Sequence, residues 1–219
     1  MKKKYIIAVD GPAGSGKSTI ARMVAKRLDY IYIDTGAMYR ALTLKVLETN
    51  TSLDDSQKII KLAEVTNISF QSKDNVLKVL LDSNDVTIQI REPKVTKNVV
   101  YIANVPEVRK IMVELQRAFG SAGGVVVEGR DITTVVFPDA RKKFYLDASF
   151  EERFERRYKQ LITEGKDISK DDLAQDMKDR DISDRKRKVG ALKIADDAIY
   201  LDTSNLSINE VVEKVLSYV

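Results

Sequence analysis

Short runs of consecutive apolar residues recur along the chain, and segments with helical spacing of their apolar positions follow them. The runs are continuous rather than alternating in polarity, as expected for parallel strands whose sheet is covered by helices on both faces. This alternation predicts an α/β fold with a doubly wound, five-stranded parallel sheet. The predicted strands cover residues 5–10, 31–34, 125–128, 143–147 and 198–202.

Seven segments have the spacing of helices, and several begin at a serine or aspartate that can cap the first turn. Ser207, followed three residues later by Glu210, matches a capping box. The first helix is expected to begin at the glycine-rich stretch before Lys17. The other six are predicted at residues 37–48, 54–65, 106–119, 149–164, 169–187 and 207–216.

One stretch interrupts this alternation. Residues 68–70, 76–81 and 86–90 have the composition of short strands, with turn signals at 74–75 and 83–85. We therefore predict a small antiparallel β insertion between the second and third parallel strands.

The 219-residue chain contains no cysteine and no histidine. This excludes disulfides, zinc sites built on those residues, thiol nucleophiles and Ser-His-Asp catalysis. The chemistry that remains relies on carboxylates, lysine, arginine, hydroxyls, backbone amides and a bound metal. These are the groups used in phosphoryl transfer.

The net charge of +4 is a mild excess of basic groups. A solvated basic surface is its commonest explanation, and binding of a small anion accounts for it as well as nucleic acid does. Apolar runs such as residues 5–9 are much shorter than the roughly 20 residues that span a bilayer. The basic start of the chain is followed by only five apolar residues before Asp10, too few for a secretory signal, so we expect a cytoplasmic protein.

The segment Gly11-Pro-Ala-Gly-Ser-Gly-Lys-Ser18 matches the phosphate-binding pattern G-x-x-x-x-G-K-[ST] in full. Glycines let the backbone N–H groups point at phosphate oxygens, and the following helix presents its positive end. Lys17 supplies a charge that can follow a γ-phosphate, and the Ser18 hydroxyl can bind Mg²⁺. An ordinary glycine-rich turn is the alternative, but the expected strand and helix flank the motif.

This motif alone predicts only a nucleoside triphosphate site. A GTPase would need a guanine-reading N-K-x-D segment after a strand, and the chain has none. A motor or transport ATPase usually has an apolar strand that ends in Asp-Glu, which is also missing. The rest of the chain must therefore indicate where the phosphate goes.

Arginines gather in three further places. Arg40 belongs to the segment Asp34-Thr-Gly-Ala-Met-Tyr-Arg40, directly after the second strand, and Arg130 belongs to Glu128-Gly-Arg-Asp131 after the third. Both segments are expected at the carboxyl edge of the sheet, where open α/β sheets bind ligands. A third group, Arg180, Asp184 and Arg187, has the spacing of one helix face. Solvated helix arginines, a structural ion pair and ordinary salt bridges are the respective alternatives.

Taken together, these arginines favour an acceptor that is itself a phosphate monoester. Its charge must be neutralised before it attacks another phosphate, and bidentate arginines do this without offering a competing nucleophile. We therefore predict an ATP-dependent kinase that acts on a phosphorylated small molecule.

The motifs named above, together with Val108-Arg109, the segment 134–140 (Thr-Val-Val-Phe-Pro-Asp-Ala) and residues 180–187, resemble bacterial cytidylate kinases over essentially the whole chain. The resemblance implies a P-loop kinase fold, ATP with Mg²⁺ as donor, and CMP or dCMP as acceptor. It also implies a core of about 1–35 and 110–219, a monophosphate-binding insertion of about 36–109 and a lid of about 150–170. We expect a monomer with no nucleic-acid or membrane partner.

The resemblance also assigns roles to individual residues. ATP phosphates would be bound by Gly11, Pro12, Ala13, Gly14, Ser15, Gly16, Lys17, Ser18 and Thr19, with Ser18 also on the metal. The cytosine edge would be read by Thr35, Arg109 and Asp131, and the pentose would be met by Tyr39, Arg180 and Asp184. The CMP phosphate would be held by Arg40, Arg130 and Arg187. The lid would carry Arg153 and Arg157, and the catalytic residues would be Lys17, Arg130, Arg157 and Arg187.

The chain departs from the family pattern at two positions. Thr133 stands where the family often has glycine, and Val100 where it often has a hydroxyl residue that reads the base. Two alternatives therefore stay open at this point: a kinase for UMP or AMP, and a nucleotide-binding regulator with a nucleic-acid partner.

Overall fold

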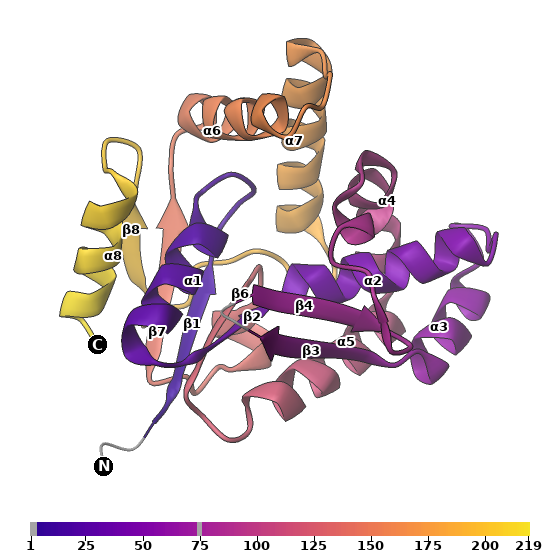
Figure 1. Cartoon of the computed structure of the whole chain (residues 1–219), viewed down its shortest axis with the longest axis horizontal. Helices are drawn as coiled ribbons and strands as arrows, with labels where there is room; N and C mark the ends of the chain where they lie inside the picture. The colour runs from indigo at the N-terminus through magenta and orange to yellow at the C-terminus, as the bar shows by residue number, and fades with distance from the viewer. Residues whose placement is uncertain (1–3, 74–75) are drawn as a thin grey trace. The chain divides into compact units, whose positions relative to one another are not determined.

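The computed structural model describes residues 4–73 and 76–219. Residues 1–3 and the turn predicted at 74–75 lie outside the described residues. The chain divides into two compact units, one comprising the chain up to Ile33 with Gly120–Val219, the other Asp34–Phe119. Figure 1 shows their elements coloured in chain order.

The first unit contains a five-stranded sheet in the order β2-β6-β1-β7-β8. β1 is parallel to β6 and β7, and β7 is parallel to β8. The α/β fold predicted from the sequence is thus confirmed. The strands are β1 (Ile6–Asp10), β2 (Ile31–Asp34), β6 (Val125–Gly129), β7 (Lys142–Asp147) and β8 (Ile199–Asp202).

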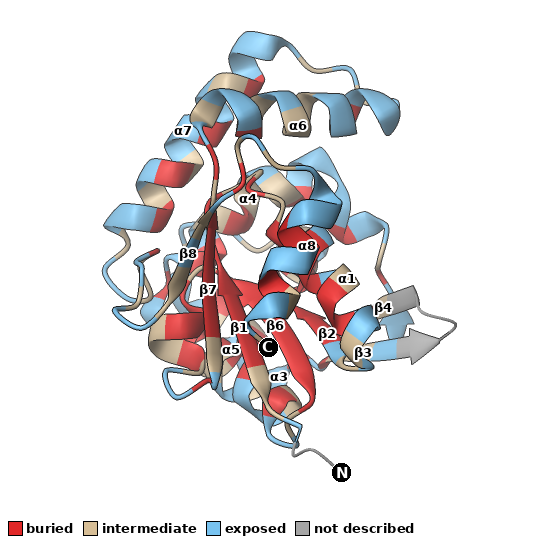
Figure 2. Cartoon of the chain, turned by 90° about the vertical axis from the view of Figure 1, so that its left-hand side faces the viewer, coloured by how far each residue is buried: buried red, intermediate tan, exposed pale blue. Residues whose placement is uncertain are grey.

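The strands at the centre of this sheet are buried on both faces. All five residues of β6 are buried, and Ile7, Ala8 and Val9 of β1 are at most 2% exposed. Figure 2 shows β1, β6 and β7 almost entirely in the colour of buried residues. Such burial on both faces explains why these strands are continuously apolar in the sequence.

The helices of the first unit are α1 (Lys17–Leu28), α6 (Phe150–Thr163), α7 (Lys170–Lys186) and α8 (Ile208–Ser217). Serine side chains accept a backbone N–H at the starts of α6, α7 and α8. The capping box predicted at Ser207 and Glu210 is present. A single π-helical turn, Ile132–Val136, follows β6.

The second unit combines helices with a three-stranded antiparallel sheet, β3-β4-β5. Large side chains in its core, such as Met38, Ile59 and Met112, are fully buried. Its elements are α2 (Thr35–Glu48), α3 (Ser56–Val65), β3 (Ile68–Lys73), β4 (Val76–Leu81), β5 (Asn84–Asp85), a 3₁₀ turn (Gln89–Arg91), α4 (Pro93–Ala103) and α5 (Pro106–Gly120).

Two elements of this unit differ from the sequence prediction. The strand predicted at 86–90 is wrong, because β5 ends at Asp85 and a 3₁₀ turn follows. The Asp85 carboxylate accepts both the hydroxyl and the backbone N–H of Thr87, at 2.6 and 3.1 Å, which turns the chain away from the strand. Helix α4 was not predicted, although its proline start and the buried Val95, Val99 and Ile102 are helical signals.

The strand register brings the ends of the parallel strands to one edge. Asp10, the last residue of β1, pairs with Gly129 of β6 and with Tyr145 of β7. The loop after β1 and the segment after β6 therefore leave the sheet at the same level. This edge is where an open α/β sheet binds its ligand.

Candidate active site

The phosphate loop, residues 11–16, connects the buried end of β1 to the first turn of α1. Gly14 and Gly16 adopt left-handed backbone conformations, with φ of 79° and 86°. A Cβ atom at Gly14 would also lie 2.7 Å from the carbonyl oxygen of Arg153 in α6. Larger residues are thus excluded at Gly14 by space and by conformation, and at Gly16 by conformation.

Lys17 begins α1 and is only 6% exposed. Its Nζ donates to the carbonyl oxygen of Pro12 at 3.0 Å, so the side chain curls over its own loop. Burial and, to a smaller extent, the positive charge of Arg130 lower the pKa of Lys17 to about 7, and Glu128 opposes this shift. A phosphate group at the loop would restore the favourable environment of the ammonium.

Ser18 and Glu128 present oxygen atoms beside the phosphate loop. The Ser18 hydroxyl donates to Glu128 Oε1 at 2.5 Å, and the Tyr32 hydroxyl donates to the same atom at 2.9 Å. Within the described ranges, no group of three or more acidic side chains could hold a metal ion. A hard cation bound here would need these protein oxygens together with phosphate and water.

Arg130 and Arg187 both bind the carboxylate of Asp184. Arg130 Nε donates to Oδ2 at 2.6 Å, and Arg187 Nη2 donates to Oδ1 at 2.5 Å. Burial alone would raise the pKa of Asp184, but Arg130, Arg180 and Arg187 hold it well below its usual range. Burial likewise opposes the charge of Arg130, yet Asp184 raises the pKa of Arg130 overall. Both groups are therefore charged at neutral pH.

The segment that carries Arg130 and Asp131 is hydrogen-bonded to Asp10, the last residue of β1. The Asp10 carboxylate accepts the backbone N–H of Ile132 at 2.9 Å, and the backbone N–H and hydroxyl of Thr133 at 2.7 and 2.6 Å. Burial raises the pKa of Asp10 to about 6, against the effect of these hydrogen bonds. Thr133, the departure from the family's glycine, thus supplies a third anchor for this turn.

The two arginines assigned to the lid have different surroundings. Arg153 is 4% exposed, and its guanidinium bonds to Ala148, Ala13 and Asp181. Arg157, one turn further along α6, is partly exposed and donates to Gln160 at 2.8 Å.

In the second unit, the motif Asp34-Thr-Gly-Ala-Met-Tyr-Arg40 forms the N-terminal cap and first turns of α2. Asp34 caps the helix by accepting the N–H of Ala37 at 2.9 Å, and its other oxygen accepts Arg40 Nη2 at 2.9 Å. A Cβ atom at Gly36 would lie 3.0 Å from Arg40 Nη1, so the glycine leaves room for the arginine. Burial would raise the pKa of Asp34, but Arg40 brings it below its usual value.

Arg109 and Tyr39 come together from α5 and α2. The Arg109 guanidinium lies 5.4 Å from the centre of the Tyr39 ring, within cation–π range, and Nη1 donates to the carbonyl oxygen of Ala103 at 3.3 Å. Arg109 is 3% exposed, and Thr35, in the first turn of α2, is equally buried.

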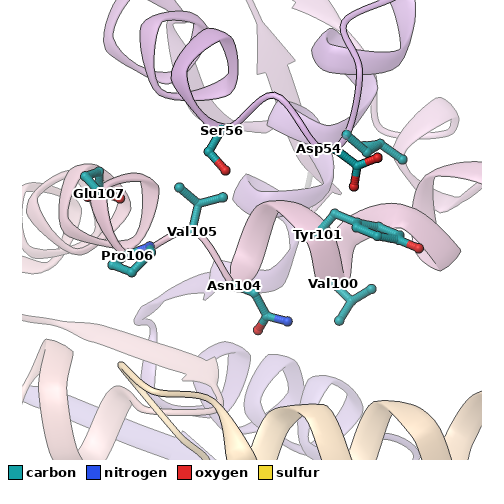
Figure 3. Close-up of a pocket in the computed structure, with 9 residues that line it drawn as sticks. Asp54, Ser56, Val100, Tyr101, Asn104, Val105, Pro106 and Glu107 are labelled. Atoms are coloured by element: carbon teal, nitrogen blue, oxygen red, sulfur yellow. The ribbon is translucent and has the colours of Figure 1, made fainter.

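Val100 lies at an open pocket of about 510 Å³ in the second unit (Figure 3). The pocket is formed by Leu53, Asp54, Ser56, Val100, Tyr101, Asn104, Val105, Pro106 and Glu107. None of the predicted substrate residues of this unit is among these described lining residues.

Among the described residues, four buried carboxylates were not assigned a role from the sequence: Asp10, Asp34, Glu128 and Asp181. Asp10 and Glu128 carried a usable signal, since an acidic residue near the end of an apolar strand needs a partner. Asp181 carried no such signal, because it lies in a highly charged helical segment and not at the end of an apolar strand. In the ranges the structure describes, no helix has the length and apolar character to cross a membrane.

Comparison with known proteins identifies the family. A sequence model of cytidylate kinase matches residues 7–219. The chain belongs to the cytidylate kinase family. The predicted family, the P-loop kinase fold and the enzyme class, a phosphotransferase, are thereby confirmed.

Named relatives agree with this assignment. A cytidylate kinase of Caldanaerobacter subterraneus is 47% identical over 209 residues, covering 95% of this chain and 92% of that protein. A cytidylate kinase of Bacillus cereus is 46% identical over 219 residues, covering 100% and 97%. An uncharacterized protein of Eubacterium ventriosum has a solved structure with a TM-score of 0.53 at 12% identity, covering 98% of each chain, and it shows similarity of fold alone.

Proposed function

We propose that this cytidylate kinase family member transfers the γ-phosphate of ATP to CMP and dCMP, forming ADP with CDP or dCDP. The observation that carries the proposal is the pairing of Arg130 and Arg187 on Asp184, in the same unit as the phosphate loop. Fixed guanidinium groups are suited to an acceptor that already carries a phosphate. The family match supports cytidine as the nucleoside.

The donor is bound by the phosphate loop. Its backbone amides and the start of α1 hold the phosphates of ATP, and Lys17 follows the γ-phosphate during transfer. Arg157, on the partly exposed face of α6, contributes charge to the transferring group. No general base is required, since the attacking phosphate oxygen of CMP is already ionised.

The acceptor is bound by the residues that the family resemblance assigns to it. Arg40, Arg130 and Arg187 hold the CMP phosphate. A cytosine ring offers two acceptors and an exocyclic amine, which suit the donors Thr35 and Arg109 and the acceptor Asp131. The remaining substrate residues, Tyr39, Arg180 and Asp184, meet the pentose.

Mg²⁺ fits the oxygen donors beside the loop. Ser18 would bind it directly, with phosphate and water, and Glu128 would accept hydrogen bonds from that shell. The bound ion would neutralise charge on the phosphates during transfer. The monomeric state, the cytoplasmic location and the expectation of no nucleic-acid partner stay predictions.

A coupled assay of ADP release tests the proposal across nucleoside monophosphates. We expect ADP from ATP only when an acceptor is present, with CMP or dCMP giving the highest kcat/KM. Faster turnover with UMP or AMP would contradict the cytosine assignment. ADP release independent of any acceptor would contradict the kinase assignment itself.

A further inference from the structure

Arg153 on α6 is buried, and its guanidinium contacts three different residues. Its Nε donates to the carbonyl oxygen of Ala148 at 3.1 Å, and its Nη1 donates to that of Ala13 at 2.9 Å. Its Nη2 forms an ion pair with Asp181 Oδ2 at 2.8 Å. One buried side chain thus joins β7's end, the phosphate loop and α7.

The contact with the phosphate loop is made on two sides. The guanidinium binds the carbonyl of Ala13, while the backbone carbonyl oxygen of Arg153 lies only 2.7 Å from the position that a Cβ atom of Gly14 would take. The start of α6 therefore packs directly on the loop that holds ATP. Because there is no free space between the first turn of α6 and the phosphate loop, a movement of this turn would also move the loop.

Arg153 contacts α7 through its ion pair with Asp181. Asp181 is buried, and within the described part of the chain its Oδ1 has no hydrogen-bond partner. Without the guanidinium on Oδ2, this carboxylate would remain a buried charge with no hydrogen-bonded cation, which is strongly unfavourable. The same helix carries Arg180 and Asp184, and Arg187 follows its last residue.

We propose that Arg153 is a positioning residue that couples ATP binding to CMP binding, since it joins the phosphate loop to the helix that presents the CMP ligands. Ordering of the loop by ATP stabilises the position of α7, and ordering of α7 by CMP stabilises the loop. The coupling is reciprocal, as linkage requires. This inference rests on the function proposed above.

Isothermal titration calorimetry on the full chain tests it. CMP is titrated with and without a non-hydrolysable ATP analogue and Mg²⁺, and the analogue with and without CMP. In the wild type we expect each ligand to tighten the other by one common factor, about 5- to 150-fold for typical couplings. Arg153→Lys keeps the charge but loses the fork that reaches Ala13 and Asp181 together, so this factor should fall towards one.

Asp181→Asn removes the same link from the α7 side and should reduce the factor equally. If Arg153→Lys does not fold, Asp181→Asn decides alone. Asp179→Asn is the matched control, because Asp179 is an exposed acid on the same helix and should keep the wild-type factor.

Three results would overturn the inference. A wild type without coupling is one, and lowered melting temperatures with an unchanged factor in both variants are another. The third is an Arg153→Lys variant that binds the ATP analogue more weakly by the same amount with and without CMP, together with an Asp181→Asn variant that binds the analogue normally. Arg153 would then contact ATP itself. A wild type that does not bind CMP at all would refute the proposed function as well.

Discussion

The sheet edge and the helix pair α6–α7 belong to the same unit but are stabilised in different ways. At the sheet edge, Asp10 and Glu128 are buried, and each accepts two or more hydrogen bonds. The helix pair buries an apolar cluster of only three residues, Leu161, Leu173 and Met177, with partly buried side chains packed around it. Figure 2 shows both helices largely in the colour of exposed residues.

This difference in packing predicts that the sheet edge and the helix pair differ in local stability. Regions with few buried apolar contacts open at lower free energy than the core of the same protein. We therefore expect α6 and α7, which carry Arg153, Arg180 and Asp184, to open at a lower free energy than the sheet that positions Lys17 and Arg130. Two ion pairs connect these regions: Arg153 joins the phosphate loop to Asp181 of α7, and Arg130, after β6, joins Asp184 of α7.

The largest effect is expected at the sheet edge itself, with Lys17→Ala. Loss of a charge aimed at the transferring phosphate should lower kcat by about 10²–10³-fold or more. Lys26→Ala, an exposed lysine on the same helix, is the control and should leave kcat unchanged. Single-turnover kinetics measures the effect, and transfer at the wild-type rate would remove Lys17 from the mechanism.

The same variant should not weaken the fold. The native pKa of Lys17, about 7, lies below its ordinary value of 10.5, so the native state disfavours the ammonium. Below pH 10 this costs stability, and the cost is complete below pH 7. Urea unfolding at pH 7 should therefore show Lys17→Ala at least as stable as the wild type, and a clear loss of stability would contradict the pKa argument.

A pair of core substitutions compares the two regions directly. Ile7→Ala in β1 should lower the free energy of global unfolding by about 2–5 kcal/mol, as for other large-to-small core changes. Leu173→Ala in α7 should instead speed hydrogen exchange in α6 and α7 and leave the sheet protected. Exchange measured by mass spectrometry distinguishes these patterns, and equal loss of protection throughout would mean that the helix pair is no separate unit of stability.

A smaller effect, confined to one substrate, is expected from Arg187→Ala. Asp184 would lose one of its arginines and, in the proposed function, the CMP phosphate would lose one of its ligands, so the KM for CMP should rise about tenfold or more. The KM for ATP should change little. Arg185→Ala, two residues away and exposed, serves as the control. Equal increases in both KM values would show that Arg187 supports the whole site rather than the acceptor.

The sequence predicted those parts of this site that depend on local pattern. The phosphate loop between β1 and α1, and the motif from Asp34 to Arg40, are each encoded within about ten residues. Contacts between distant segments were not predictable, because Asp184 is 54 residues from Arg130 and Asp10 is 123 residues from Thr133. No spacing rule indicates which of many arginines will meet a given carboxylate across such separations.

The smallest effect concerns Thr133, whose role could not be foreseen because the family often has glycine there. Removing its hydroxyl in Thr133→Val deletes a hydrogen bond that lowers the pKa of Asp10, so this pKa should rise above about 6, by roughly one unit. Because the native pKa already exceeds the ordinary 3.8, the stability contributed by Asp10 is greatest below pH 4 and falls as pH rises through 6. In the variant this fall should extend to higher pH.

NMR titration of the aspartate carboxyl carbons measures the shift, with Thr134→Val as the neighbouring control. If Asp10 titrated at the same pH in both variants, the hydroxyl would not be an anchor of the turn, and the backbone N–H groups of Ile132 and Thr133 alone would hold it.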